Sequence, residues 1–140
     1  MRETIIANIE LMNLEPVCLV HDDYWPGNTV WRRGRLSAIV DWTSAEVSDP
    51  RFDIAQCRAD LALMHGQAAA EAFLAAYEAV SDRPLDRLWF FDLVRGRSAL
   101  EYYASWLPGY HDLGLTSLTA ALLSQRVREF LALALEKAAS

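Results

Sequence analysis

The sequence is poor in lysine and has no long apolar run. Twelve of its thirteen basic residues are arginines, and the single lysine is Lys137, near the end of the 140 residues. No internal lysine can therefore form a Schiff base or serve a phosphate-binding loop of the GxxxxGK[ST] type. No apolar stretch is long enough to cross a membrane, and Glu3, Asn8 and Glu10 interrupt the opening segment, which excludes the apolar region of a signal peptide. We expect a soluble, cytoplasmic protein with no membrane partner.

Cysteine and histidine are also scarce. Cys18 and Cys57 lie far apart and belong to no CxxC or Cys/His cluster. We interpret both as small, buried apolar residues in a reducing compartment. His21, His65 and His111 lack the mutual spacing of zinc ligands, so no zinc site is predicted.

The charge is acidic, because 13 Lys and Arg face 19 Asp and Glu, a formal net charge of −6. Nucleic-acid binding rests on basic side chains that neutralise phosphates, so no nucleic-acid partner is expected. An acidic chain suits a cationic small substrate better. Apolar residues make up 53% and charged residues 23%, an ordinary globular mixture. The length predicts one domain spanning residues 1–140.

Apolar periodicity predicts a mainly helical α+β fold with a short β element near its start. The run 17–20 reads as a buried strand, and 29–31 with 36–40 reads as a hairpin that turns near Gly34. We expect residues 41–50 to be irregular. A glycine after residue 65 and the Pro108-Gly109 pair mark expected helix ends. Helices are predicted over 3–13, 51–65, 67–80, 85–107 and 116–138.

Polar side chains concentrate around residues 21–28 and at Asp41. If the hairpin turns about Gly34 and Arg35, residues whose numbers sum to about 69 lie opposite each other, as Asn28 and Asp41 do. An amide oxygen and a carboxylate brought together make an oxygen-only site of the kind that Mg²⁺ accepts.

Asp23 lies two residues after His21 and five before Asn28, which is the HxDxxxxN spacing of a kinase catalytic loop. In such a loop one carboxylate orients the attacking hydroxyl or accepts its proton. An amide and a second carboxylate hold the metal that bridges the phosphates of ATP.

Three ordered motifs carry a family resemblance: HDDYWPGN at 21–28, AIVDW at 38–42 and DPRFDIA at 49–55. They resemble the HGDxxPxN, IDW and DPxxDLA motifs of the aminoglycoside phosphotransferase/choline kinase-like family. The resemblance implies a protein-kinase-like C-terminal lobe in which a small β-hairpin carries the metal ligands. The implied reaction transfers the γ-phosphoryl group of ATP to a hydroxyl of a small molecule, with an aminoglycoside- or choline-like amine as one option.

The resemblance also implies roles for individual residues. Asp23 would be the catalytic base, and Asn28 and Asp41 would bind Mg²⁺ and, through it, ATP. Asp53 would be a buried brace that accepts hydrogen bonds from the loop, and His21 would be a structural loop residue.

Two departures from the family pattern stand out. Asp22 replaces the family glycine and adds a negative charge beside Asp23, which could raise the pKa of Asp23, recruit another cation, or simply face solvent. In addition, only twenty residues precede His21 and none is lysine. We therefore expect the N-terminal nucleotide lobe to be absent, so that this is a truncated C-lobe, a lobe completed in trans or by a second protomer, or a chain that has lost the reaction.

Aromatic residues near the motifs and in the third long helix invite a cation-binding interpretation. Trp25, Tyr102 and Trp106, together with Asp22, are the candidate substrate contacts. The alternative is that most of these rings pack the helix onto the core.

Three functions remain open at this point. The leading one is the catalytic lobe of an ATP- and magnesium-dependent O-phosphotransferase. The second is a non-catalytic kinase-like binding domain. The third is a metal-dependent phosphohydrolase built on His21 and Asp22, which would need further histidines nearby.

Overall fold

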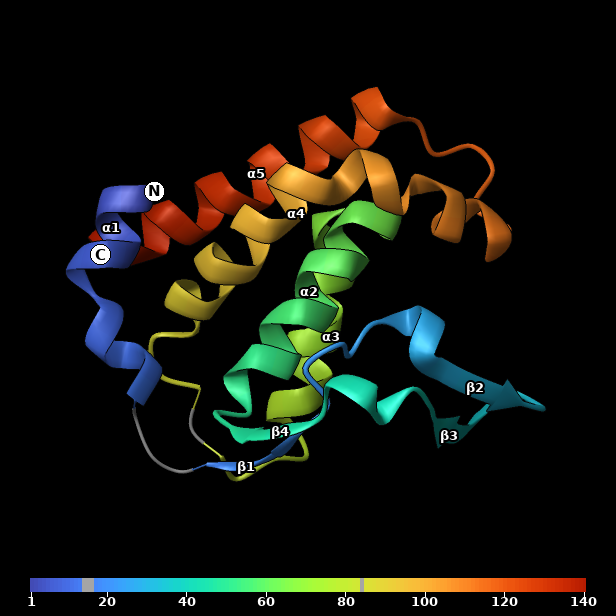
Figure 1. Ribbon diagram of the computed structural model, residues 1–140, viewed down its shortest axis with the longest axis horizontal. Coiled ribbons are helices and arrows are strands. Elements are labelled where there is room, and N and C mark those ends of the chain that lie inside the picture. Colours follow the sequence, from blue (N-terminus) through green and yellow to red (C-terminus); the bar gives the residue numbers. More distant parts are fainter. Residues whose placement is uncertain (14–16, 84) are drawn as a thin grey trace.

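The computed structural model describes residues 1–13, 17–83 and 85–140 (Figure 1). It is predominantly helical with two small antiparallel sheets, which confirms the α+β class. The α-helices are α1 (Arg2–Ala7), α2 (Arg51–His65), α3 (Gln67–Glu78), α4 (Leu88–Asp112) and α5 (Ala120–Ala139). The strands are β1 (Cys18–Val20), β2 (Thr29–Arg32), β3 (Arg35–Ile39) and β4 (Glu46–Ser48). Short 3₁₀ turns are η1 (Ile9–Asn13), η2 (Pro26–Asn28) and η3 (Trp42–Ser44).

Helices α2, α4 and α5 enclose the main core. Leu63, Leu93, Leu123 and Val127 are all buried there. Gly96 allows the close approach of α4 and α5, because a Cβ at this position would lie 2.7 Å from the Leu131 side chain. Figure 1 shows these two helices running side by side.

A second core lies at the N-terminal ends of α2 and α4. It is built from the rings of Phe52, Phe90 and Phe91, with Leu11 of η1 buried beside them. The Phe52 and Phe91 rings meet edge to face, 4.9 Å between centroids. Burial of Leu11 beside these rings places η1 against the helical body.

Buried polar groups tie the helices together. Arg58 of α2 lies in the interior, donates to the Asp92 carboxylate at 3.2 Å and to the Ala70 carbonyl at 3.2 Å, and so links α2 to α4 and α3. Arg126 of α5 donates to the Leu63 carbonyl at 2.7 Å and the Met64 carbonyl at 2.9 Å. These carbonyls end α2 and have no partner within the helix, so Arg126 caps α2 from another element.

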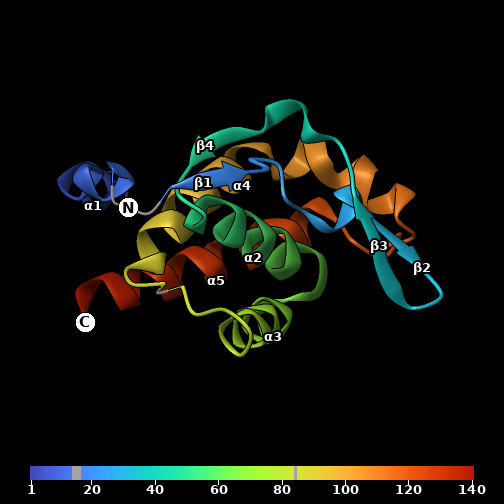
Figure 2. The same ribbon diagram turned by 90° about the horizontal axis from the view of Figure 1, so that it is seen from below.

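The two sheets lie at the side of the helical body. β1 pairs with β4, with Leu19 opposite Val47, and β2 pairs with β3 (Figure 2). The hairpin β2–β3 extends away from the helices in both views. The prediction that 41–50 is irregular was wrong, because β4 forms there. The strand at 17–20 was predicted correctly, but only Val20 of it is buried while Leu19 is exposed.

The helix predictions were mostly confirmed, with errors over 3–13 and at Pro108. The segment predicted as one helix over 3–13 is divided into α1, which ends at Ala7, and η1. Gly66, at φ 92°, ends α2 as expected, and its N–H donates to the Ala62 carbonyl at 2.9 Å. The α4 helix, however, continues through Pro108 to Asp112 and bends in its second half (Figure 1). Burial of Tyr110 against α2 stabilises this last part of α4 despite the proline.

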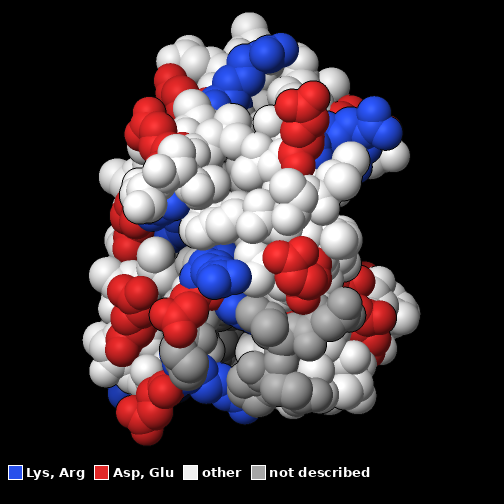
Figure 3. All heavy atoms as spheres, turned by 90° about the vertical axis from the view of Figure 1, so that its left-hand side faces the viewer, with Lys and Arg blue, Asp and Glu red and all other residues white. Residues whose placement is uncertain are grey.

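Charged side chains are mixed on the side of the molecule that carries α1. Figure 3 shows separate groups of acidic side chains there with basic ones between them. In the part of the chain that the structure describes, no helix combines the length and the apolar character needed to cross a membrane.

Candidate functional site

Residues 21–28, here called the Asp23 loop, are held in place by the side chain of Asp53 of α2. The Asp53 carboxylate accepts the backbone N–H of His21 at 2.7 Å and that of Asp22 at 2.9 Å. Asp53 is half-buried and lies in the first turn of α2. One side chain therefore holds two consecutive amides of the loop, which is the contact that a brace at this position would make.

His21 uses both ring nitrogens within the fold. Its Nε2 lies 2.8 Å from the Val40 carbonyl, which can only accept, and its Nδ1 accepts the backbone N–H of Asp23 at 3.3 Å. The ring is buried and lies 4.7 Å from the Trp42 ring. This arrangement requires the neutral ring with its proton on Nε2, so His21 joins the loop to the end of β3.

Asn28, the last residue of the loop, contacts Asp23 near its start. The Nδ2 amide of Asn28 donates to the Asp23 carbonyl at 2.9 Å and to Asp23 Oδ2 at 3.0 Å. Both amide hydrogens are then directed at Asp23, so Oδ1 is the atom of Asn28 that is left for a cation. The structure thus brings together two of the residues that the sequence singled out.

Asp41 lies at the end of β3, next to Val40. The Val40 N–H donates to the Asn28 carbonyl at 2.9 Å, so Asn28 stands opposite Val40 rather than Asp41. The predicted pairing was wrong because the hairpin turns at Arg33 and Gly34, one residue earlier than predicted, and the extra residue between Leu36 and Ala38 on β3 offsets only part of that shift. Asp41 is one residue further on, in a left-handed conformation.

The side chain of Asp41 remains open to a ligand. It is exposed, and its Oδ1 accepts the Thr43 hydroxyl at 2.8 Å. The second oxygen has no hydrogen bond from another described residue. Carboxylate and amide oxygens are donors that Mg²⁺ accepts when water and phosphate oxygens complete the shell. Among residues 1–13, 17–83 and 85–140, no group of three or more His, Cys, Asp or Glu is placed to hold a metal ion. The phosphohydrolase hypothesis therefore gains no support.

Asp22 forms an ion pair with Arg95 of α4. Its charge is thus paired within the protein and does not simply face solvent. Asp22 does not line the cavity described next, so it is not placed as a substrate contact there.

A cavity of about 320 Å³ opens beside Asp23, between α2 and the second half of α4. It is lined by Asp23, Trp25, Gln56, Asp60, Ser105, Trp106, Gly109 and Tyr110. The cavity therefore includes two of the three aromatic candidates, Trp25 and Trp106. The third, Tyr102, is exposed and stacks on Trp106 with 6.4 Å between the rings, outside the lining.

Asp60 is a buried carboxylate in this cavity that the sequence analysis missed. Its Oδ1 accepts the Tyr110 hydroxyl at 2.6 Å, and its Oδ2 accepts Gln56 Nε2 at 2.6 Å. Burial raises the pKa of Asp60 to about 6, and the charge of Asp23 adds to this shift, although the two hydrogen bonds oppose it. Burial and the charge of Asp60 raise the pKa of Tyr110.

A sequence signal for Asp60 existed. Asp53, Gln56 and Asp60 recur at intervals of three and four residues, which places polar groups on one face of a helix whose other positions are mostly apolar. That stripe faces the Asp23 loop and the cavity, as the contacts of all three show.

The sequence matches the phosphotransferase enzyme family over residues 1–89, about two thirds of the chain. The chain belongs to the phosphotransferase enzyme family. This confirms the resemblance to aminoglycoside phosphotransferases and choline kinases that the three motifs indicated. No curated protein and no solved structure matches the sequence.

Membership of the phosphotransferase family supports phosphoryl transfer as the general chemistry. The matched region holds the Asp23 loop, the hairpin, Asp41 and the first half of the cavity wall, because α2 lies inside it. The other wall, formed by Ser105, Trp106 and Tyr110 of α4, lies beyond residue 89. The motifs thus lie inside the family match, whereas the wall that faces them lies outside it.

Proposed function

We propose that this chain is the kinase-like catalytic lobe of an ATP- and magnesium-dependent phosphotransferase that acts on a hydroxyl of a small molecule. The observation that carries the proposal is the contact between Asn28 and Asp23, because it joins a metal-type ligand to a carboxylate that lines a cavity. The order of the three motifs and the family membership add to it.

Each residue has a defined task in this proposal. Asp23 would orient the acceptor hydroxyl and accept its proton as the phosphoryl group moves, since it is the motif carboxylate at the cavity. Asn28 Oδ1 and Asp41 would hold Mg²⁺, which when bound neutralises charge on the phosphates of ATP. His21 and Asp53 would keep the loop and the end of β3 in place through the hydrogen bonds described above.

The cavity favours an acceptor that carries a positive charge. Among the described residues, no Lys or Arg lines the cavity. Asp60 and Asp23 supply carboxylates, and Trp25 and Trp106 supply ring faces. Cations are attracted to both kinds of group. An amino alcohol or aminoglycoside-like amine would satisfy this lining.

The sequence itself favours a second candidate, a non-catalytic kinase-like binding domain. The only lysine is Lys137, so the lysine that pairs with phosphates in kinases is not among residues 1–136. For turnover we propose that a separate nucleotide lobe or a second protomer supplies that group. Without it, the chain would bind its ligand and leave it unchanged.

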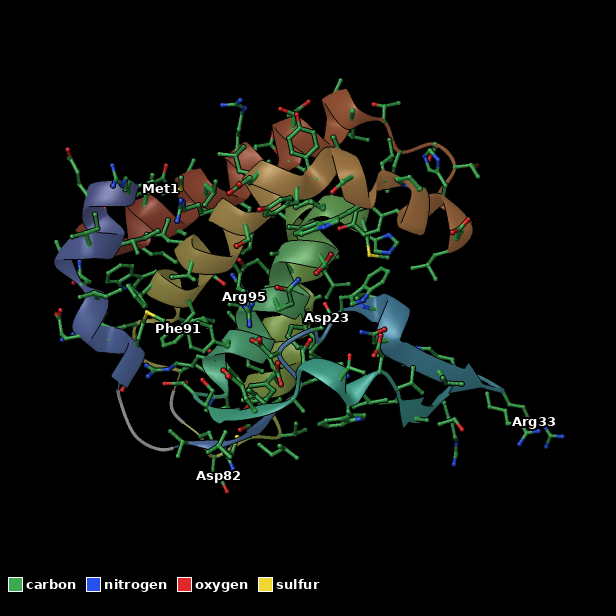
Figure 4. All side chains as sticks on the ribbon, in the orientation of Figure 1. Met1, Asp23, Arg33, Asp82, Phe91 and Arg95 are labelled. Carbon is green, nitrogen blue, oxygen red and sulfur yellow. The ribbon has the colours of Figure 1, made fainter. Side chains whose placement is uncertain are left out.

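Thermal unfolding with and without Mg–ATP tests the nucleotide half of the proposal. Ligand at about 100 times its dissociation constant should add roughly 2.7 kcal/mol, a shift of several degrees. Asp41→Asn should abolish the shift, whereas Asp82→Asn, an exposed aspartate away from the Asp23 loop (Figure 4), should retain it. Equal shifts in both variants would contradict the metal role of Asp41.

Phosphoryl transfer to a panel of amino alcohols, measured with a nucleotide lobe present, separates the two candidates. Asp23→Asn should lower turnover by at least a hundredfold while the Mg–ATP shift remains, because it removes the base and leaves the proposed metal ligands. Saturable amine binding without any transfer would favour the binding domain. Full activity of the Asp23 variant would contradict the catalytic proposal.

A further inference from the structure

Asp22 occupies a backbone conformation that suits glycine. Its φ is 60°, in the left-handed region, where a side chain with a Cβ is disfavoured. The family motif has a glycine here, whereas this chain has a charged residue directly before Asp23. Something in the fold must therefore hold residue 22 in place.

Two elements hold Asp22. Its backbone N–H donates to Asp53 Oδ1 of α2 at 2.9 Å, and its side chain forms the ion pair with Arg95 of α4. Figure 4 shows Arg95 extending from α4 toward the segment that carries Asp23. Residue 22 is thus fixed from both helices that wall the cavity.

Arg95 has little else to bind. Its guanidinium lies 5.2 Å from the centre of the Phe52 ring, and its side chain is 17% exposed. Its Nε is buried without a hydrogen-bond partner, and Asp22 is its one ion-pair partner among the described residues. The charge of Arg95 also opposes the rise in the pKa of Asp60, but Asp22 is the carboxylate that it contacts. A largely buried cation depends on such a contact, so the pair is expected to be strongly coupled.

We propose that Arg95 is a positioning residue that fixes the Asp23 loop through Asp22. The helix that carries Arg95 also carries Ser105, Trp106 and Tyr110 of the cavity wall. The ion pair therefore sets the place of Asp23 relative to the opposite wall, where the acceptor would lie. This inference takes from the proposed function only the reaction in which the Asp23 loop takes part. The role of Arg95 in holding the loop does not depend on that function.

Hydrogen exchange measured by mass spectrometry on the whole chain tests the proposal without any need for turnover. Arg95→Met keeps the length of the side chain and removes its charge. It should raise exchange of residues 21–25 at least tenfold while exchange in α5 changes less than twofold. Arg97→Met, an exposed arginine on the same helix, should leave the loop unchanged. Arg95→Lys keeps the charge and should restore most of the protection.

Asp22→Gly completes the cycle, because glycine tolerates the left-handed conformation and leaves no carboxylate unpaired. The double variant that combines Arg95→Met with Asp22→Gly should exchange no faster in the loop than Asp22→Gly alone. The proposal would be overturned if the effects of Arg95→Met and Asp22→Gly on loop exchange add up in the double variant. Equal loop exchange in Arg95→Met and Arg97→Met would also overturn it. If Arg95→Met does not fold, Arg95→Gln, which also removes the charge, gives the same comparison with and without Asp22→Gly. If Mg–ATP does not raise the thermal unfolding midpoint of the unmodified chain, that result counts against the proposed function and not against this inference.

Discussion

The helical body and the strand region are stabilised in different ways. In the helices, Leu63, Phe91 and Leu93 are completely buried, whereas the strand residues Leu19 and Val47 are 64% and 71% exposed. The strand region has almost no core of its own, and side chains such as Asp53 and His21 hold it to the helices. Apolar packing of the helices therefore supplies most of the stability, whereas a few directed hydrogen bonds to the helices set the position of the Asp23 loop.

The largest effect should come from the helical body. Phe91→Ala removes a fully buried ring that packs on Phe52 and Phe90 (Figure 4). We expect a loss of about 3–5 kcal/mol in the free energy of unfolding, because a cavity remains after the ring is removed. Urea denaturation followed by circular dichroism measures it. A loss near 1 kcal/mol would mean that the helical body is less tightly packed than its burial indicates.

Removing the brace should have a smaller and more local effect. Asp53→Ala takes away the acceptor of two loop amides, and hydrogen bonds to charged groups contribute about 1.5–3 kcal/mol. We expect a loss in this range in urea, with exchange of residues 21–25 raised more than that of α5. Asp53→Asn keeps one acceptor oxygen, so its free energy of unfolding should lie between those of the unmodified chain and Asp53→Ala. Uniform faster exchange would show that the strand region does not depend on this side chain.

The pH dependence of stability tests Asp60, the buried carboxylate at the boundary between the two regions. Burial raises its pKa to about 6, so the folded chain binds this proton more tightly than the unfolded chain does. Its stabilising contribution is complete below about pH 4 and is lost as the pH rises to about 6. Relative to Asp60→Asn, the unmodified chain should lose about 1–3 kcal/mol between pH 4 and pH 7. Parallel pH profiles of the two proteins would contradict this.

The smallest effect should come from an exposed strand position. Val47→Thr keeps the β-branched shape on β4 and changes only a solvated side chain. The free energy of unfolding should change by less than about 0.5 kcal/mol in the same urea experiment. A larger loss would show that this face of the strand region is covered by another part of the protein or by a partner.

Local features of the fold could be predicted from the sequence. The hairpin turn and the end of α2 at Gly66 depend on nearby residues, and so did the motifs that revealed the family. The pairing of Asn28 with Asp41 was one residue off, because the alternation of apolar residues does not fix whether the chain turns at Arg33 and Gly34 or at Gly34 and Arg35.

Long-range contacts could not be predicted. The partner of Asp22 is 73 residues away on α4, and the carboxylate of Asp60 meets Tyr110 across 50 residues. Both contacts depend on how α4 packs on α2, which no local pattern specifies. The continuation of α4 through Pro108 depends on the same packing, because burial of Tyr110 outweighs the low helix propensity of proline.

The cap that Arg126 places on the end of α2 has a consequence for synthesis. A chain emerging from the ribosome exposes the Asp23 loop and all of α2 well before residue 126 is added. Until then the Leu63 and Met64 carbonyls lack the guanidinium that satisfies them in the finished fold. The end of α2 is thus translated before its cap, and its last carbonyls gain the guanidinium only when α5 docks.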